Sequence, residues 1–535
     1  MENREHYPVL VIGTGIAGLS AAFSLARAGV RVLLVTKASD PSDCNTLWAQ
    51  GGIIYRGVED SPSRLVEDII QAGAGLCNEE AVRFLAEEGP KVVRSILLDE
   101  VKVPFSTDRE GELDLTQEGA HSVSRIIHAG DSTGRAIEIA LLRRVREEPN
   151  ITLATELTAI DLLTTHHHPT EIQVRYRLAN ECVGAYLLDN RTNEVYSVFA
   201  DYTILATGGV GQVYLHSTNT RHTIGDGVVM ASRAGARIMN AEYVQFHPTA
   251  LAHKRTNHFL ISEALRGEGA RLKNQGGEYF MERYAPELKD LAPRDVVTRA
   301  IVEEMTGRKE EFVWLDLANF YSGEEPIRER FPTIWEECRA IGIDIEREPI
   351  PVVPAAHYFC GGILVNTFGE STLERLYAIG ETSCTGVHGA NRLASTSLLE
   401  GLTWGFFAAA SIHEKLRAPS AAPAGRGAVD ERIFGSIPDW NPAGNVNMED
   451  PALILQDWTT IQHTMWNYVG IVRTVERLER AVADMRDLGS RLTKYYHEAA
   501  MSRDIVELFH GQNIAWIIAN VAMKNPVSRG AHFRK

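Results

Sequence analysis

A short stretch at residues 117–131, "QEGAHSVSRIIHAGD", places a carboxylate beside groups suited to binding an anion. Glu118 heads the stretch, and His121, Arg125 and His128 follow it. Cationic and hydrogen-bonding side chains attract an anionic substrate, whereas a carboxylate repels one unless the substrate also carries a positive charge. We therefore ask whether Glu118 recognises a cationic group. The alternative is a glutamate that caps a helix or lies on the surface.

A second motif, "GTGIAG", has the spacing of a dinucleotide-binding turn. In such a turn Gly13 permits the sharp bend, Gly15 lets a pyrophosphate approach the backbone, and Gly18 allows close packing of helix on strand. The helix N-terminus then faces the phosphates. The position about 20 residues further on, which is acidic in NAD-binding proteins, falls near Thr36 and Lys37. The motif therefore predicts a bound dinucleotide and disfavours NAD.

The elements that would hold this turn form a βαβ unit at the start of the chain. Apolar runs predict strands at 8–12 and 31–35, and helical periodicity predicts a helix over about 16–28. Two later strand-like runs, "YTILATGG" at 202–209 and "RLYAIGE" at 375–381, end in small residues, as strands do beside a bound cofactor. The nucleotide-binding fold is therefore expected to combine distant segments of the chain.

Composition limits the class of protein and its partners. A chain of 535 residues with 44% hydrophobic and 23% charged residues is expected to form several globular domains. The formal charge of −16 argues against non-specific binding to nucleic acid or to anionic lipid. No apolar run reaches the roughly 18 residues of a membrane-spanning helix, and the chain does not open with a signal peptide. We expect a cytoplasmic protein that binds neither nucleic acid nor membrane.

Cysteines and clustered histidines do not predict a metal site. The cysteines have no C-x-x-C spacing and are expected to be free thiols; they are Cys44, Cys77, Cys182, Cys338, Cys360 and Cys384. The tract His166, His167 and His168 is followed by Pro169. Adjacent side chains do not converge on one ion, so this tract is predicted to be a solvated loop.

Several longer motifs carry a family resemblance. They include "NTLWAQGG", "LATGG", "GDGVVMASRAGA", "QFHPTAL", "SEALRGEGARL", "LAPRDVVTRAI", "PAAHYFCGGILV" and "LYAIGETSCTGVHGANRLASTSLLEG". Together and in this order they resemble the succinate dehydrogenase/fumarate reductase flavoprotein family over nearly the whole chain. The resemblance implies FAD as the cofactor. It also implies an active site between a discontinuous FAD-binding domain and an inserted domain that closes over the flavin.

The expected fold is α/β, with a Rossmann-like discontinuous FAD-binding domain, an inserted α+β capping domain and a C-terminal helical domain. The two parts of the FAD-binding domain are predicted at 1–235 and 351–416, with the capping domain at 236–350 between them. A Pro- and Ala-rich linker is predicted at 417–429, and the helical domain at 430–535, with helices mainly over 451–523.

The resemblance also implies which residues contact FAD. The matching positions are Gly13, Gly15, Gly18, Lys37, Asn45, Gly51, Gly52, Asp226, Glu381, Ser397 and Leu398. Membrane-bound members attach FAD covalently through a histidine in S-H-T-x-x-A-Q-G-G. This chain has Asn45 at that position, so FAD is expected to be held non-covalently. For Glu381 alone, a salt bridge is an equally good interpretation.

Five further positions match the family residues that hold a four-carbon dicarboxylate, namely His247, Ser262, Arg294, His357 and Arg392. Arginine suits this role because its planar fork donates two parallel hydrogen bonds to one carboxylate. Each residue also has a structural alternative. Arg294 could pair with the adjacent Asp295 at the surface, and His247, before a proline, could cap a turn.

The reaction implied is oxidation of L-aspartate to iminoaspartate, with oxygen, which gives hydrogen peroxide, or fumarate as the electron acceptor. This reaction begins de novo quinolinate and NAD biosynthesis, with quinolinate synthase as a partner downstream. Arg294, Glu118 and His247 are the expected catalytic residues; Ser262, His357 and Arg392 are expected to bind substrate. Glu118 would read the amino group, because family members that act on L-aspartate carry a glutamate in this stretch.

Two alternatives remain open. One is a fumarate reductase or succinate dehydrogenase type of flavoprotein subunit, which Asn45 and Glu118 disfavour. The other is a non-catalytic or RNA-modifying FAD-binding module, which the acidic charge and the paired dicarboxylate motifs disfavour.

Overall fold

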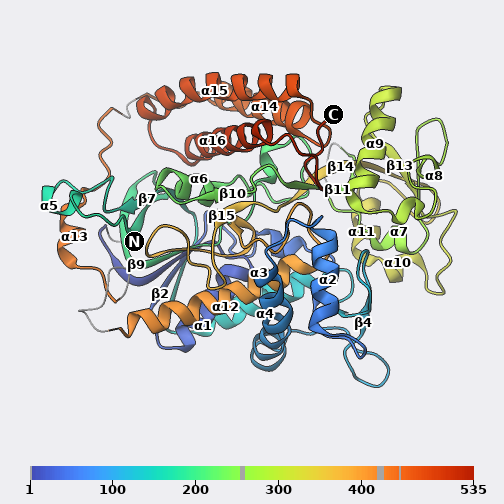
Figure 1. The fold of residues 1–535 in the computed structure, drawn as a ribbon, viewed down its shortest axis with the longest axis horizontal. Helices are drawn as coiled ribbons and strands as arrows, with labels where there is room; N and C mark the ends of the chain where they lie inside the picture. The colour runs from blue at the N-terminus through green and yellow to red at the C-terminus, as the bar shows by residue number, and fades with distance from the viewer. Residues whose placement is uncertain (1–2, 254–258, 419–426, 445–446) are drawn as a thin grey trace.

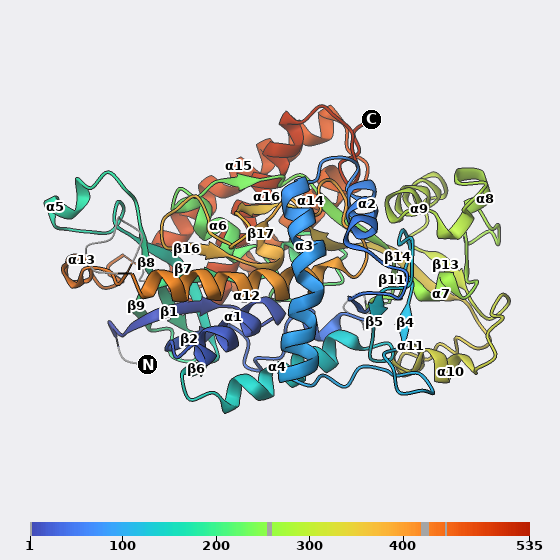
Figure 2. The same ribbon diagram turned by 60° about the horizontal axis from the view of Figure 1, so that its bottom comes forward.

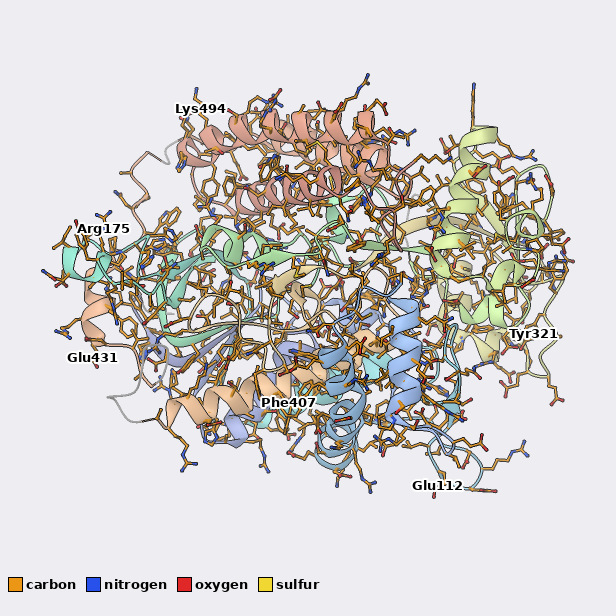
Figure 3. The ribbon with its side chains drawn as sticks, in the orientation of Figure 1. Glu112, Arg175, Tyr321, Phe407, Glu431 and Lys494 are labelled. Carbon is orange, nitrogen blue, oxygen red and sulfur yellow. The ribbon has the colours of Figure 1, made fainter. Side chains whose placement is uncertain are left out.

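The computed structural model describes residues 3–253, 259–418, 427–444 and 447–535. Figures 1 and 2 show a central sheet, a second lobe at one side of it and a layer of C-terminal helices over it. With side chains drawn, Lys494 lies on the outer face of the C-terminal layer and Tyr321 on the second lobe (Figure 3). The fold class predicted from the sequence is confirmed.

The N-terminal βαβ unit is present as predicted, to within about two residues. It consists of β1 (His6–Ile12), α1 (Ile16–Arg27) and β2 (Val32–Val35). The two strands are parallel and pair from Val9 with Val32 to Ile12 with Val35. Their Val, Leu and Ile side chains are buried, which is typical of a parallel sheet covered on both faces.

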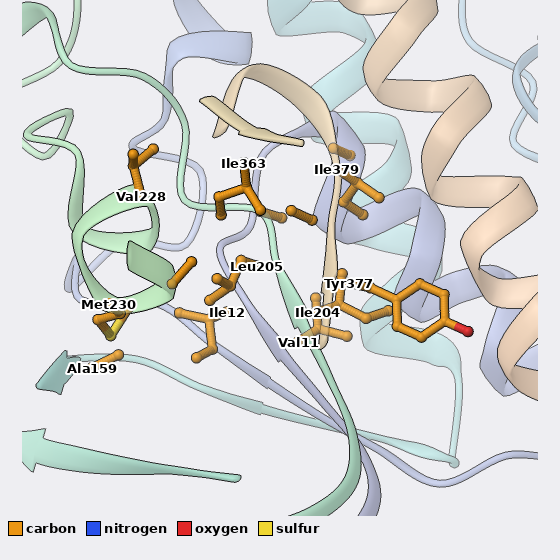
Figure 4. Close-up of a cluster of buried hydrophobic side chains, with 14 of the residues drawn as sticks. Val11, Ile12, Ala159, Ile204, Leu205, Val228, Met230, Ile363, Tyr377 and Ile379 are labelled. Carbon is orange, nitrogen blue, oxygen red and sulfur yellow. The ribbon is translucent and has the colours of Figure 1, made fainter. Parts of the chain in front are cut away.

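Distant segments complete the central seven-stranded sheet, whose order is β6-β2-β1-β9-β8-β7 with β16 paired to β9. β9 (Val195–Leu205) lies parallel to β1, and β16 (Leu376–Ala378) lies parallel to β9. Figure 4 shows side chains of these three strands packed together, among them Ile12, Leu205 and Tyr377. The other strands of the sheet are β6 (Ile151–Ala154), β7 (Leu157–Thr164) and β8 (Cys182–Asp189).

Helices cover both faces of this sheet. α12 (Thr396–Leu416) lies beside α1 below the sheet in Figure 1. The same side holds α2 (Pro62–Ala72), α3 (Glu79–Val92), which continues into η2 (Val93–Glu100), and α4 (Thr133–Glu147). α6 (Asp226–Arg233) lies on the opposite face, under the C-terminal helices.

Short elements fill the remaining connections. The described residues also form two three-stranded sheets. One comprises β3 (Ile53–Ile54), β5 (Ile126–Ile127) and β4 (Leu115–Thr116). The other comprises β10 (Ile238–Met239), β15 (Gly362–Leu364) and β17 (Ser383–Cys384). The short helices are η1 (Asn45–Trp48), α5 (Ile172–Arg175), η3 (Gly211–Val213), η5 (Gly380–Thr382) and α13 (Glu431–Ser436).

The inserted lobe has its own antiparallel sheet and its own core. The sheet order is β11 (Val244–Leu251), β14 (Ile350–Phe359), β13 (Val313–Asp316) and β12 (Arg271–Lys273). Its helices are α7 (Ala264–Gly267), α8 (Met281–Tyr284), η4 (Lys289–Leu291), α9 (Arg294–Arg308), α10 (Ile327–Arg330) and α11 (Pro332–Ala340). A separate cluster of buried side chains runs from Leu251 to Val352. The domain boundaries at 236 and 350 stay a prediction.

The C-terminal layer is helical over 451–523, as the sequence predicts, and the structure divides it into three helices. It consists of α14 (Pro451–Val469), α15 (Val475–Glu498) and α16 (Arg503–Lys524). Asp450, Thr474 and Ser502 precede the three helices, and each side chain accepts a hydrogen bond from an amide of the first turn. Most of the predicted linker, residues 419–426, lies outside the described residues.

The remaining sequence predictions concern thiols, histidines and membrane helices. All six cysteines are free thiols, as predicted. His166 to His168 lie in a turn after β7, and the part of the chain that the structure describes contains no His, Cys, Asp and Glu cluster able to hold a metal ion. Among the described helices, none is both long and apolar enough to cross a membrane.

Candidate active site

A cavity of about 1160 Å³ lies between the central sheet, the inserted lobe and the start of α12. It brings together all but one of the site residues predicted from the sequence. These are Gly13, Gly15, Lys37, Asn45, Gly51, Gly52, Glu118, Asp226, His247, Ser262, Arg294, His357, Glu381, Arg392, Ser397 and Leu398. Gly18 does not line the cavity.

The glycine turn shows why its residues must be small. Gly13 has φ +117°, and a Cβ there would lie 2.1 Å from the carbonyl oxygen of Ala206. A Cβ on Gly18 would lie 2.0 Å from the carbonyl oxygen of Gly13. Gly18 therefore allows close packing of α1, whereas Gly13 and Gly15 border the cavity where a nucleotide can approach the backbone and the N-terminus of α1.

Lys37 and Asp226 form an ion pair at the cavity, with 2.6 Å between Nζ and Oδ2. Asp226 Oδ1 also contacts His510 Nδ1 of α16 at 2.9 Å. Burial would raise the pKa of Asp226, but Lys37 and His510 outweigh this effect and lower it. The two predicted nucleotide contacts therefore belong to one network with the C-terminal helices.

Asn45 and Glu381 meet across the cavity. Asn45 Oδ1 accepts hydrogen bonds from the Thr220 amide at 3.0 Å and from the Thr223 hydroxyl at 3.1 Å. Its Nδ2 donates to Glu381 Oε2 at 3.4 Å, and Glu381 Oε1 accepts from the Phe359 amide at 2.9 Å. Burial raises the pKa of Glu381 to about 7. These partners of Glu381 are neutral, so its contacts do not match the salt-bridge alternative.

The predicted dicarboxylate residues form a buried cluster with spare hydrogen-bonding capacity. The rings of His247 and His357 lie 5.2 Å apart, and the Arg392 guanidinium lies 4.5 Å from the centre of the Tyr358 ring. Burial, with nearby arginines, holds the pKa of both histidines well below the ordinary value, so both rings are neutral. Within the described chain, Arg392 Nε and Arg294 Nη1 are buried without a hydrogen-bond partner. Such orphaned donors suit an anionic ligand.

Glu263 and Arg266 belong to this cluster, although sequence reasoning missed both. Arg294 Nε donates to Glu263 Oε2 at 2.7 Å, and Glu263 Oε1 lies 3.5 Å from Arg266 Nη2. Burial would raise the pKa of Glu263, but Arg294 and Arg266 hold it at about 2. The signal available in the sequence is "SEALRG", where both residues follow Ser262 closely. Arg294 is not a surface partner of Asp295, which pairs with Arg299 at 2.9 Å.

Replacing Glu263 by glutamine is expected to lower kcat for the cavity's substrate by about 10- to 150-fold, because Arg294 then loses the ion pair that fixes its guanidinium. Glu303→Gln, an exposed change on the helix that carries Arg294, is the control. Steady-state kinetics of both purified variants provide the measurement. Equal kcat values in the two variants would show that Glu263 does not orient Arg294.

Glu118 lies at the cavity in a loop with several attachments. Its Oε2 accepts a hydrogen bond from the Ser395 hydroxyl at 2.7 Å. Ser395 immediately precedes α12 and has φ +55°. Through this contact Glu118 could also serve a structural role at the start of α12. Gly51 lets the carboxylate lie close to the backbone, since a Cβ there would be 2.7 Å from Glu118 Oε1. His121 Nε2 donates to the carbonyl of Ala394 at 3.1 Å.

Arg125, the third predicted group of this stretch, serves the loop rather than the cavity. It is fully buried, with Nη2 3.1 Å from Asp60 and Nη1 2.8 Å from Asp68. Asp68 also accepts from the amide and hydroxyl of Ser122. His128 lines the cavity and contacts Asp114 at 3.1 Å.

Two family models match the chain, an FAD binding domain over residues 8–398 and a fumarate reductase flavoprotein C-terminal region over 458–535. L-aspartate oxidase of Pseudomonas aeruginosa is 42% identical, over 100% of this chain and 96% of that protein. L-aspartate oxidase of Acinetobacter baylyi is 40% identical over 100% and 94%, and the chloroplastic L-aspartate oxidase of Arabidopsis thaliana is 39% identical over 99% and 81%. The chain belongs to the L-aspartate oxidase family.

Solved structures place this family among the succinate dehydrogenase/fumarate reductase flavoproteins. Quinol fumarate reductase of E. coli matches with TM-score 0.86 and 28% identity, over 100% of this chain and 92% of that chain. Sdh1 of Mycobacterium smegmatis matches with TM-score 0.82 and 27% identity, over 100% and 89%. The chain is an FAD-dependent oxidoreductase, and the glycine turn and polar cavity described above fit FAD.

Proposed function

We propose that this chain oxidises L-aspartate to iminoaspartate, with FAD as the first electron acceptor and oxygen or fumarate as the second. The observation that supports this most is the composition of the cavity. Arg294 and Arg392 bring unpartnered buried donors to it from two parts of the fold. Glu118 adds a carboxylate that accepts a hydrogen bond from the neutral Ser395 hydroxyl. This set matches a substrate with two carboxylates and one ammonium group.

In this proposal the side chains bind and orient L-aspartate before any bond changes. Arg392 and Arg294 donate to the carboxylates, while neutral His247 and His357 and the hydroxyl of Ser262 add hydrogen bonds without further charge. Glu263 fixes the guanidinium of Arg294 through the 2.7 Å contact. Arg294 acts first by orientation and electrostatics, since a guanidinium stays protonated in proteins.

Oxidation removes a hydride from the α-carbon and a proton from the amino group. FAD, when bound, supplies the chemistry that accepts the hydride. Glu118 faces the ammonium group and takes its proton, because only the neutral amine has a lone pair to form the imine. In this proposal the inserted lobe covers the substrate and excludes water. A hydrogen bond already joins the two parts, from Gln50 Nε2 of the sheet domain to the carbonyl of Leu260 in the lobe at 2.7 Å.

A fumarate reductase or succinate dehydrogenase type of subunit is the second candidate, favoured by the structural likeness alone. Succinate has no ammonium group that the carboxylate of Glu118 could face, so Glu118 favours the first proposal. We further propose that the protein works in the cytoplasm and that its unstable imine product passes to quinolinate synthase. FAD contacts are assigned to Gly13, Gly15, Lys37, Asn45, Gly51, Gly52, Asp226, Glu381, Ser397 and Leu398, while Gly18 supports the turn through the packing of α1.

A peroxide assay on the purified yellow protein tests the proposed reaction. L-aspartate is expected to give peroxide in air, whereas D-aspartate, L-glutamate and succinate are not. Peroxide with none of the four compounds would revive the non-catalytic alternative. Oxidation of succinate alone would favour the second candidate.

FAD is expected to be non-covalent, because an asparagine amide cannot form the bond that links histidine to flavin in membrane-bound relatives. In the structure Asn45 is instead hydrogen-bonded to Thr220, Thr223 and Glu381. Acid precipitation should release the yellow colour into the supernatant. Flavin that stays with the pellet would disprove this prediction.

A further inference from the structure

The C-terminal helix α16 reaches the nucleotide end of the cavity through three side chains. Glu507 Oε1 lies 2.9 Å from Lys37 Nζ, and Arg503 Nε donates to the same Glu507 oxygen at 3.0 Å. One turn further along, His510 Nδ1 lies 2.9 Å from Asp226 Oδ1. Lys37 and Asp226 line the cavity, whereas the α16 residues lie behind them.

The position of Lys37 identifies this as the nucleotide end. Lys37 follows β2, and in dinucleotide-binding folds the end of the second strand approaches the ribose next to the glycine turn. Its ammonium group lies between two carboxylates, those of Asp226 and Glu507. Two partners fix the direction of the long, flexible Lys37 side chain more firmly than one partner would.

The support for Asp226 is equally direct. His510 is fully buried, and its second ring nitrogen, Nε2, donates to the carbonyl of Ile160 in β7 at 3.1 Å. The ring therefore links the sheet to the first residue of α6. Gly225, just before α6, packs so closely on α16 that a Cβ there would lie 2.9 Å from Ile514 Cγ1. Helix α16 therefore contacts both the side chain of Asp226 and the residue that precedes it.

The same helix also supports the neighbouring wall of the cavity. Arg503 Nη2 contacts His222 Nδ1 at 2.6 Å, and His222 Nε2 contacts Asp43 at 3.0 Å. His222 and Asp43 both line the cavity. Three cavity residues, Lys37, His222 and Asp226, therefore contact side chains of α16 directly. Asp43 is linked to the helix through His222.

We propose that Glu507 and His510 are positioning residues for FAD, which hold Lys37 and Asp226 in place for the nucleotide. The C-terminal helical layer is thus part of the FAD-binding apparatus rather than only a support for the fold. This inference rests on the proposed assignment of Lys37 and Asp226 to FAD. It does not depend on the identity of the substrate.

The test is a titration of FAD into stripped apoprotein, followed by flavin fluorescence. Glu507→Gln is expected to raise the Kd for FAD by about tenfold or more, the loss expected for one charge-assisted contact, and His510→Asn to raise it similarly. Glu479→Gln, an exposed change on α15, is the matched control and should leave Kd unchanged. The melting temperature of each apoprotein shows whether the change acts on FAD or on folding.

A positioning role requires a weaker Kd in a variant whose apoprotein melts like the parent. It also predicts an unchanged KM for L-aspartate at saturating FAD. An unchanged Kd in Glu507→Gln, or a weaker Kd matched by an equal loss of apoprotein stability, would overturn the inference. If His510→Asn does not fold, Glu507→Gln decides alone.

Lys37→Met separates this inference from the assignment on which it rests. If Lys37→Met binds FAD as the parent does, the assignment of Lys37 is wrong and the inference falls with it. If Lys37→Met weakens FAD binding and Glu507→Gln does not, only the role of α16 is wrong. Because the titration contains no substrate, failure of the proposed reaction would leave its result unchanged.

Discussion

Replacing Arg392 by leucine is expected to reduce kcat/KM for L-aspartate by about 10- to 150-fold while FAD stays bound. Arg392 is buried, its Nη1 donates to Ser397 at 3.2 Å, and its Nε has no partner among the described residues. Leucine keeps an apolar side chain over the Tyr358 ring but removes every donor. Loss of one charge-assisted hydrogen bond costs about 1.5–3 kcal/mol, which corresponds to this range.

Steady-state kinetics and the flavin absorbance of the same preparation provide the measurement. His247→Ala should change kcat/KM in the same direction, since the two side chains face one cavity. Arg417→Leu, an exposed change just after α12, is the matched control and should behave as the parent. An unchanged kcat/KM in Arg392→Leu would remove this residue from the substrate site, and loss of flavin would assign it to the cofactor.

Glu118→Gln is expected to lose L-aspartate oxidation by at least about 10- to 150-fold while fumarate reduction by a reduced dye survives. The reason is charge: a glutamine amide neither stabilises an ammonium group nor accepts its proton, and fumarate has no amino group. Glutamine can still accept the hydrogen bond from Ser395, which now holds Glu118 at 2.7 Å. The loop is therefore expected to stay in place.

Both activities are measured on one preparation of Glu118→Gln, beside Glu112→Gln as an exposed control. If oxidation and fumarate reduction fall together, Glu118 has a structural role through Ser395. If neither falls, the amino group is read elsewhere in the cavity. Only a selective loss of oxidation supports recognition of the substrate's amino group by Glu118.

Local patterns in the sequence predicted the elements that depend on local physics. The βαβ unit follows from apolar runs and a glycine turn, because Gly13 and Gly18 occupy places where a Cβ would overlap the backbone. The helical character of 451–523 follows from periodicity, and the structure adds the caps at Thr474 and Ser502 that begin two of its helices. The strand predicted within 202–209 ends at Leu205, and the small residues that follow it line the cavity.

Other features depend on contacts between segments that are distant in sequence. Glu263 stands in the motif "SEALRG", but its role appears only when α9 brings Arg294 within 2.7 Å. Likewise, Glu507 looks like an ordinary helix-surface glutamate until α16 packs beside Lys37. The family resemblance supplied the positions that face the cavity, whereas the residues behind them required the structure.

The most direct test of the proposed reaction is a single turnover without oxygen. Flavin-loaded protein is mixed anaerobically with L-aspartate, the yellow colour is followed, and the products are then assayed. We predict loss of the colour and about one equivalent each of oxaloacetate and ammonia per flavin, since free iminoaspartate hydrolyses to these two compounds. Colour that persists with L-aspartate but disappears with a chemical reductant would contradict the proposal that this chain oxidises L-aspartate.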